Sequence, residues 1–252
     1  MNGIEKFNKD ESIEKQEKEI RDEIELLAED FNAENIPVDD NCRLNIKGYE
    51  SRYTSDEIEK DYRYIKEKER EFANTEGLTV EKWKESKKFR NGEKFEQLKT
   101  VVFNRNFSNP DIIAVRASDY DDYKNSIDNV IINKKTGDII CALDEVADDK
   151  NGKRYIEKER KIKEINEKGG AELKYGLTFE DGKPVLKEIK GVSIFILSLS
   201  SLELREAVKN FGSGKFENKL FKEKFGKQAI EQLRKLPSYV SQDLKEQWMN
   251  CF

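Results

Sequence analysis

The sequence of 252 residues carries a formal net charge of −5, and 39% of its residues are charged against 36% that are hydrophobic. A chain of this length fits one large domain, or a core with helical additions, and its charged residues are expected on long solvated helices. The sequence contains no histidine, which excludes Ser-His-Asp and Cys-His catalysis as well as histidine metal sites.

Three helices are expected before the central part of the chain. Apolar residues recur with helical spacing over residues 12–31 and 55–73. Thr79 is in place to cap a third, short helix, with Trp83 and Phe89 expected to face inward. Together these segments predict a packed helical lobe over residues 1–88, with a role in gripping a partner or a nucleic acid as the alternative.

The pattern changes near residue 92, where apolar runs of strand length begin to alternate with helical periodicity. Ser200 and Glu203 match a capping box, so helices are expected again after the last strand. The order α-β-β-β-α-β-β-β predicts an α/β (α+β) fold with a mixed sheet. The expected segments are a helix at 92–107, strands at 112–118, 126–133 and 138–146, a helix at 153–168, a hairpin at 171–190 and an apolar strand at 191–200, which places a core at 89–200 and a C-terminal helical region at 201–252.

The hairpin IDNVIINKKTGDIICALDEV, residues 127–146, has acidic residues at its open end. Its turn suits a four-residue loop in which Gly137 takes a positive φ. In that register Asp128 lies opposite Leu143 and shares a face with Glu145, with Cβ atoms roughly 7 Å apart. One residue more or fewer in the loop would exchange Glu145 for Asp144 on that face.

Two interpretations of these carboxylates remain open from the hairpin alone. In the first, the open end of the hairpin lies in solvent. In the second, a divalent ion lies between the carboxylates. No third arrangement is favourable, because burying two carboxylates without a cation costs roughly several kcal/mol. The nearby cluster ASDYDDYKNSID does not match a calcium-binding loop. It is expected to be an acidic loop that joins two strands, with a contribution of Asp119 to a metal site as the alternative.

A helix carrying GEKFE, the strand IIAVRAS, a strand with Asp128 and a strand ending in DEV are followed by a helix and a strand. This order resembles the PD-(D/E)xK nuclease superfamily over about residues 88–200. The resemblance implies a restriction-endonuclease-like α-β-β-β-α-β core flanked by N- and C-terminal helices. Gly92 and Glu96 stand in its G-x-x-x-E spacing, Asp128 fits its second-strand aspartate, and Glu145 or Asp144 fits its third-strand acid.

The activity that the resemblance implies is hydrolysis of phosphodiester bonds in nucleic acid, with DNA as the expected substrate. Glu96, Asp128 and Glu145, or Asp144 in the other register, would hold Mg²⁺ or Mn²⁺, the hard ions that carboxylates favour. Such an ion lowers the pKa of a bound water and stabilises charge on the phosphate.

The lysine of the family motif is missing, because Ala147 stands two residues after Glu145. Lys174, on a later strand, is the expected catalytic substitute, with Lys158 and Lys161 on the preceding helix as alternatives. If no lysine reaches the acids, the chain would be an inactive member that binds nucleic acid or protein. Arg105, Arg116 and Lys158 are expected to contact phosphates, with ordinary ion pairs as the alternative for the arginines.

The sequence also bears on partners and location. It contains no run of 18 apolar residues, which predicts no membrane-spanning helix and no membrane partner. Its first residues lack the apolar centre of a signal peptide, and its three cysteines are far apart. We therefore expect a cytoplasmic protein, while the sequence indicates no oligomeric state.

Overall fold

The structure is a computed structural model that describes residues 2–235 and 242–251. Its element order matches the predicted alternation, except that a short helix, α5, replaces the expected acidic loop. The elements are α1 (Asn2–Ala33), a 3-10 turn (Ile46–Tyr49), α2 (Ser55–Thr75), α3 (Val80–Lys87), α4 (Asn91–Asn106), β1 (Ile112–Arg116), α5 (Asp119–Asn125), β2 (Asn129–Asn133), β3 (Ile139–Val146), α6 (Lys153–Glu167), β4 (Ala171–Glu180), β5 (Lys183–Val192), β6 (Ile194–Ser198), α7 (Ser201–Lys209), α8 (Gly214–Lys219), a π-helical segment (Leu220–Gly226), α9 (Lys227–Leu233) and α10 (Gln242–Cys251).

The central sheet has the strand order β1-β2-β3-β6 among the described residues. Strand β2 is antiparallel to both of its neighbours, β1 and β3, and β6 runs parallel to β3, so the predicted mixed sheet is confirmed. All five residues of β6 are buried, as its apolar sequence predicts. Strands β4 and β5 pair separately as the expected hairpin, whose turn residues Asp181 and Gly182 both have positive φ.

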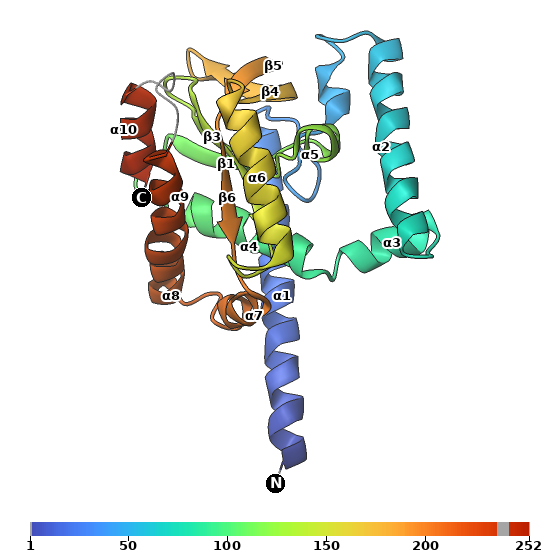
Figure 1. Ribbon diagram of the computed structural model, residues 1–252, viewed down its shortest axis with the longest axis vertical. Coiled ribbons are helices and arrows are strands. Elements are labelled where there is room, and N and C mark those ends of the chain that lie inside the picture. Colours follow the sequence, from blue (N-terminus) through green and yellow to red (C-terminus); the bar gives the residue numbers. More distant parts are fainter. Residues whose placement is uncertain (1, 236–241, 252) are drawn as a thin grey trace.

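Helices α4 and α6 cover opposite faces of this sheet (Figure 1). Successive residues of a strand point to opposite faces. Glu145 of β3 reaches Lys99 of α4, whereas its neighbour Asp144 reaches Lys158 of α6. The two consecutive acids are therefore separated by the sheet itself.

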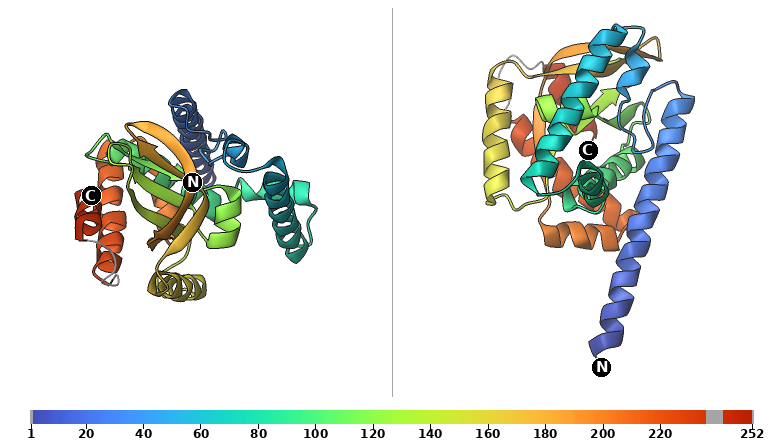
Figure 2. Two further views of the ribbon diagram at one scale, coloured as in Figure 1. Left: turned by 90° about the horizontal axis from the view of Figure 1, so that it is seen from above. Right: turned by 90° about the vertical axis from the view of Figure 1, so that its right-hand side faces the viewer.

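The three N-terminal helices lie in two places rather than in one packed lobe. Helix α1 packs on α4 and α7, where Ile20, Ile24 and Phe31 join the main core. Helices α2 and α3 form the right-hand edge of the molecule in Figure 1, and α2 contacts α5 through a smaller core that includes Tyr175 of β4 (Figures 1 and 2).

The loop of the β2–β3 hairpin is as predicted, but the pairing beyond it is shifted by one residue. Gly137 has a φ of +76°, and a side chain there would collide with the carbonyl oxygen of Phe179. Ile140 forms a β-bulge, because Ile132 pairs with Ile139 while the preceding residue pairs with Cys141. Consequently Asn129 lies opposite Leu143, and the predicted Asp128–Leu143 pair is wrong.

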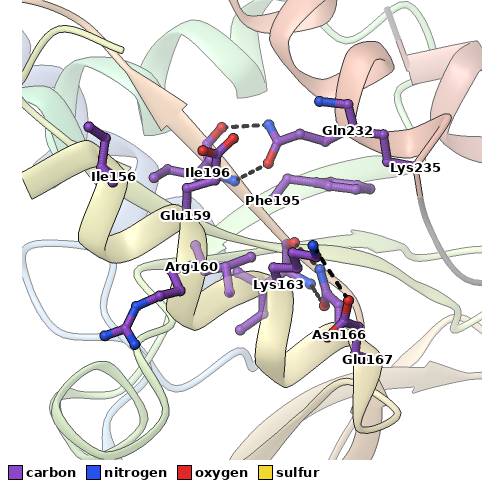
Figure 3. A pocket seen from close by; sticks show the side chains of 12 residues that line it. Ile156, Glu159, Arg160, Lys163, Asn166, Glu167, Phe195, Ile196, Gln232 and Lys235 are labelled. Atoms are coloured by element: carbon purple, nitrogen blue, oxygen red, sulfur yellow. Dashed lines mark hydrogen bonds and ion pairs between the residues drawn. The ribbon is translucent and has the colours of Figure 1, made fainter. Parts of the chain in front are cut away.

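The outer edge of β6 is bound by three side-chain amides instead of another strand. Asn166 of α6 accepts the N–H of Ile194 and donates to its carbonyl oxygen, at 2.9 and 2.8 Å. Gln232 makes the same two bonds to Ile196, and Gln228 makes them to Ser198. Figure 3 shows Asn166 and Gln232 in a pocket of about 670 Å³ between α6 and α9.

We expect Gln228→Leu to lower the free energy of unfolding by about 2 kcal/mol, because it leaves the buried N–H and C=O of Ser198 without partners. Urea denaturation measures this change. Gln242→Leu is the matched control, because that glutamine is exposed and, among the described residues, its side chain hydrogen-bonds to the side chain of Glu246 and to no buried backbone group. Equal effects of the two substitutions would contradict a structural role for the amide at β6.

Candidate functional site

Three carboxylates from different elements converge at one end of the sheet. Glu96 lies on α4, Asp122 on α5, and Asp128 directly before β2. One oxygen of each lies within 4.8 Å of the others, a spacing at which they could hold a metal ion together. The sequence indicated Glu96 and Asp128, and the structure brings these two together, whereas it did not indicate Asp122.

Asp122 reaches the site because the segment after β1 is helical. The side chain of Ser118 accepts the N–H of Asp121 and caps α5, and Ser126 ends the helix with a positive φ of 58°. In a helix, residues three apart share a face. Asp119 and Asp122 therefore both point toward Arg43, at 3.7 and 3.2 Å. The Ser-x-x-Asp spacing of Ser118 and Asp121 is the signal that could have predicted this helix.

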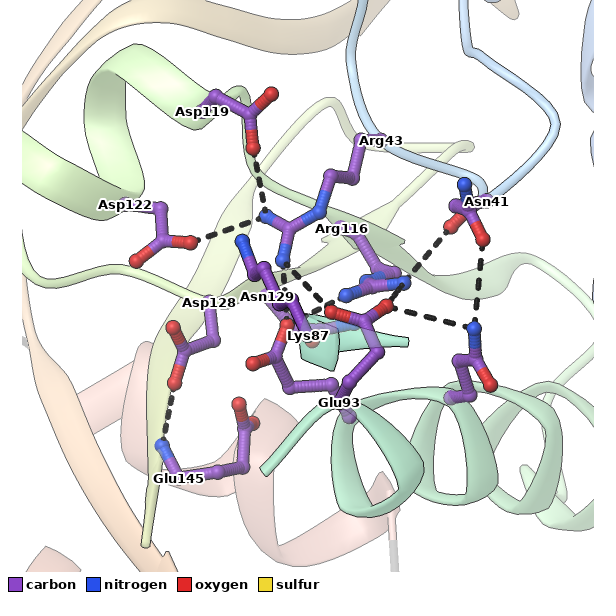
Figure 4. Close-up of polar contacts among 12 residues, drawn as sticks. Asn41, Arg43, Lys87, Glu93, Arg116, Asp119, Asp122, Asp128, Asn129 and Glu145 are labelled. Carbon is purple, nitrogen blue, oxygen red and sulfur yellow. Dashed lines mark hydrogen bonds and ion pairs between the residues drawn. The ribbon is translucent and has the colours of Figure 1, made fainter. Parts of the chain in front are cut away.

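Two buried arginines hold the acidic residues of α4 (Figure 4). Arg43 donates to Glu96 at 2.6 Å. Arg116 donates to the same oxygen of Glu96 at 2.5 Å and to Glu93 at 2.8 Å. The side chain of Arg116 has no exposed surface, so it fixes the position of Glu96 from the protein interior. A contact between Arg116 and a phosphate would require the guanidinium to leave Glu93 and Glu96.

Arg105, the other arginine expected near phosphates, lies elsewhere on α4. Its guanidinium pairs with Glu23 at 2.7 Å and with Glu217 at 3.3 Å, and it lies over the ring of Phe211. These contacts join α4 to α1 and α8. Arg105 therefore forms ordinary ion pairs, which was the alternative to a phosphate contact for this residue.

Glu145 and Asp144 occupy different environments because they face different helices. The main-chain N–H of Glu145 donates to Asp128 at 2.7 Å, and its carboxylate forms an ion pair with Lys99. Asp144 accepts from Lys158, and its second oxygen is buried without a hydrogen-bond partner among the described residues. Burial and the neighbouring Asp128 raise the pKa of Asp144 to about 7.

Lys99 is the lysine that sequence reasoning missed. Its side chain is fully buried, donates to Asn129 at 2.8 Å and pairs with Glu145. Burial lowers the pKa of Lys99 to about 7, against the opposing influence of Asp128. Its position gave a usable signal, because residue 99 shares a helical face with the buried Phe95, where a lysine needs a partner.

The other candidate lysines lie in three different places. Lys158 donates to the carbonyl oxygen of Glu145 at 2.6 Å as well as to Asp144, so it lies beside the acids. Lys161 donates to Ser126. Lys174, the predicted catalytic lysine, instead pairs with Asp61 of α2 and is surrounded by tyrosine rings.

The convergent carboxylates lie in a cleft of about 940 Å³. Its lining includes Asp128, Glu145 and Lys158, but Lys99 lies behind Glu145 and is not part of it. Further lining residues are cationic and aromatic side chains from α2, α3, α5, α6 and the connection between α3 and α4, namely Phe72, Trp83, Lys87, Phe89, Arg90, Tyr123, Arg154 and Lys161.

Among the ion-paired residues around the convergent carboxylates, acidic side chains outnumber basic ones. Burial and the neighbouring Asp128 raise the pKa of Asp122 well above its ordinary range. Burial alone would lower the pKa of Lys158, but the neighbouring Asp128 and Asp144 outweigh it and raise that pKa as well, which keeps the ammonium group charged. In this group seven carboxylates, those of Glu93, Glu96, Asp119, Asp122, Asp128, Asp144 and Glu145, face four cations, those of Arg43, Lys99, Arg116 and Lys158, a formal excess of three negative charges within the group. The remaining lining of the cleft adds four cations, Lys87, Arg90, Arg154 and Lys161, and one acid, Glu157.

Comparison with known proteins gives no assignment for this site. The sequence matches no protein-family model, and neither curated proteins nor solved structures give a significant match to the chain. None of the helices in the described residues is long and apolar enough to cross a membrane. Functional conclusions therefore depend on the chemistry of the cleft.

Proposed function

We propose that this chain is a metal-dependent nuclease that hydrolyses phosphodiester bonds of nucleic acid, with DNA as the expected substrate. The observation that carries the proposal is the convergence of Glu96, Asp122 and Asp128 in a cleft. A restriction-endonuclease-like core is part of the proposal. It is supported by the order α4-β1-β2-β3-α6-β6, in which β6 returns parallel to β3 after the hairpin β4–β5.

The donor set fits a hard divalent ion, Mg²⁺ or Mn²⁺. Glu96 and Asp122 each bind arginine through a single oxygen, and Asp128 uses one oxygen for the N–H of Glu145. A second carboxylate oxygen thus remains on each residue, and oxygen ligands are those that these ions prefer. A divalent cation would also offset the excess negative charge. When bound, it would supply a water of lowered pKa and stabilise charge on the phosphate.

Two lysines have separate roles in this proposal. Lys158 lines the cleft beside Asp128, and its ammonium group would stabilise negative charge on the scissile phosphate. Lys99 lies behind Glu145 and fixes the position of that carboxylate, so it is a positioning residue. Lys99 thus lies on the α4 side of β3 and Lys158 on its α6 side, and in this proposal they take the place of the motif lysine that the sequence lacks after Glu145.

The alternative is a protein of the same fold that binds nucleic acid or protein without catalysis. One observation favours it: Arg43 already places a guanidinium between Glu96 and Asp122, at 2.6 and 3.2 Å. An arginine in this position offsets part of the charge that a metal ion would neutralise. In this alternative the acids and arginines form a structural ion-pair network.

Metal binding and cleavage distinguish these functions. We expect saturating Mn²⁺ to raise the melting temperature by about 5 °C or more, because it binds the folded state and relieves repulsion among carboxylates. Mg²⁺ or Mn²⁺ should support cleavage of plasmid or oligonucleotide DNA, and EDTA should stop it. Nucleic-acid binding that is independent of metal, with no thermal shift and no cleavage, would support the alternative instead.

We place this activity in the cytoplasm. The three cysteines, Cys42, Cys141 and Cys251, are free and buried, which is typical of proteins kept in a reducing compartment. Burial raises the pKa of each thiol, so these side chains are unreactive core residues rather than candidate nucleophiles.

A further inference from the structure

One side of the cleft is a row of charged side chains on α6. Arg154, Glu157, Lys158 and Lys161 line it, and they recur at the three- and four-residue spacing that places them on one helical face. Arg154 and Lys161 are exposed and form no ion pair with a carboxylate in the described part of the chain. Such a row can follow successive phosphates along a nucleic-acid backbone.

The other side of the cleft is aromatic. Phe72 stacks on Trp83 with ring centroids 5.8 Å apart, and Tyr123 packs edge-on against Phe72 at 5.5 Å. Phe89, in the connection between α3 and α4, was expected to face inward, but this is wrong because it is 65% exposed. It has no ring partner among the described aromatic residues, although it lines the same cleft as Asp128.

We propose that the cleft binds single-stranded nucleic acid, with phosphates along α6 and a base stacked on Phe89. This inference rests on the proposed function for the choice of nucleic acid as ligand. The faces of bases in a continuous duplex are already stacked on one another, and inserting an aromatic side chain between them costs the energy of unstacking. An aromatic surface beside the phosphates therefore stacks on a base without that cost only in an unpaired strand. The substrate class is therefore a single strand, or the unpaired end or loop of a longer molecule.

Equilibrium binding tests this inference without requiring cleavage. The probe is a fluorescein-labelled oligothymidylate of about 20 nucleotides, compared by anisotropy with a DNA hairpin duplex of equal length in EDTA. We expect the wild-type protein to bind the single strand about tenfold more tightly than the duplex. An oligodeoxyuridylate and an oligouridylate, which differ only in the 2′-hydroxyl, report whether the sugar matters when they are measured in parallel.

Three substitutions assign the effect to residues. Phe89→Ala should weaken oligothymidylate binding about tenfold, the scale of one lost stacking contact, and Phe89→Tyr should restore it. Leu26→Ala is the matched control, because Leu26 is also exposed but lies on α1, away from the cleft. Arg154→Gln should weaken binding and reduce its salt dependence, which reports a phosphate contact.

The outcomes separate this inference from the proposed nuclease activity. Binding that prefers the single strand and requires Phe89 supports the inference even if no cleavage occurs with any metal. Equal or tighter binding of the duplex, or unchanged binding by Phe89→Ala, overturns it. Cleavage of duplex DNA by the Phe89→Ala protein at the wild-type rate would also overturn it, while leaving the nuclease activity established.

Discussion

Asp128→Asn is expected to reduce Mg²⁺-dependent cleavage about a thousandfold or more, because the site loses one of three charges that hold the metal ion. The substitution suits the test because asparagine keeps an oxygen that can accept the N–H of Glu145. The fold should therefore persist while the metal affinity falls. Initial rates on a labelled oligonucleotide, measured with circular dichroism of the same samples, check this expectation.

Helix α5 offers a matched pair of controls for this experiment. Asp122 belongs to the convergent carboxylates, whereas Asp119 lies outside them and contacts Arg43 only at 3.7 Å. Asp122→Asn should cause a loss comparable to that of Asp128→Asn, and Asp119→Asn should leave the rate within about threefold. If Asp119→Asn and Asp122→Asn behave alike, Asp122 is not a metal ligand.

The second large effect concerns the buried pair of Lys99 and Glu145. We expect Lys99→Met to lower the free energy of unfolding by about 3 to 5 kcal/mol, because it leaves a buried carboxylate without its partner. Methionine fills a similar volume, so the loss reports the ion pair and the hydrogen bond to Asn129 rather than a cavity. Urea denaturation with linear extrapolation measures the change.

A double substitution separates the structural role of the pair from its role in the site. Lys99→Met combined with Glu145→Gln removes both charges and should recover about half or more of the lost stability. Cleavage should remain low in the double variant, because Glu145 is no longer held as a carboxylate in the cleft. A Lys99→Met protein as stable as wild type would show that Glu145 is already neutral or solvated.

The sequence alone is sufficient to predict those elements of the fold whose burial follows the local apolar pattern. The face of α4 that carries Phe95 and Leu98 is buried as its spacing predicts, and Ser200 caps α7 with Glu203 in the predicted capping box. The loop at Gly137 follows from glycine's tolerance of positive φ. These features depend on contacts within one segment, which a sequence displays directly.

The remaining parts of the site depend on contacts that no local pattern encodes. The bulge at Ile140 changes which residue lies opposite Asp128, and apolar alternation looks the same with or without it. Arg43 stands alone in a loop near Pro37, with nothing to indicate that Glu96 and Asp122 would surround it. Lys174 was the expected catalytic lysine, but Asp61 and two of the tyrosines that surround it, Tyr53 and Tyr120, come from distant segments.

The amides along β6 have a consequence beyond the stability of that strand. An outer strand usually exposes a row of donors and acceptors to which an extended segment of another protein can hydrogen-bond, and such pairing can propagate into fibrils or domain-swapped dimers. Asn166, Gln228 and Gln232 already occupy these positions on alternate residues of β6. Intermolecular growth of the sheet from this edge is therefore blocked by side chains that belong to the same fold.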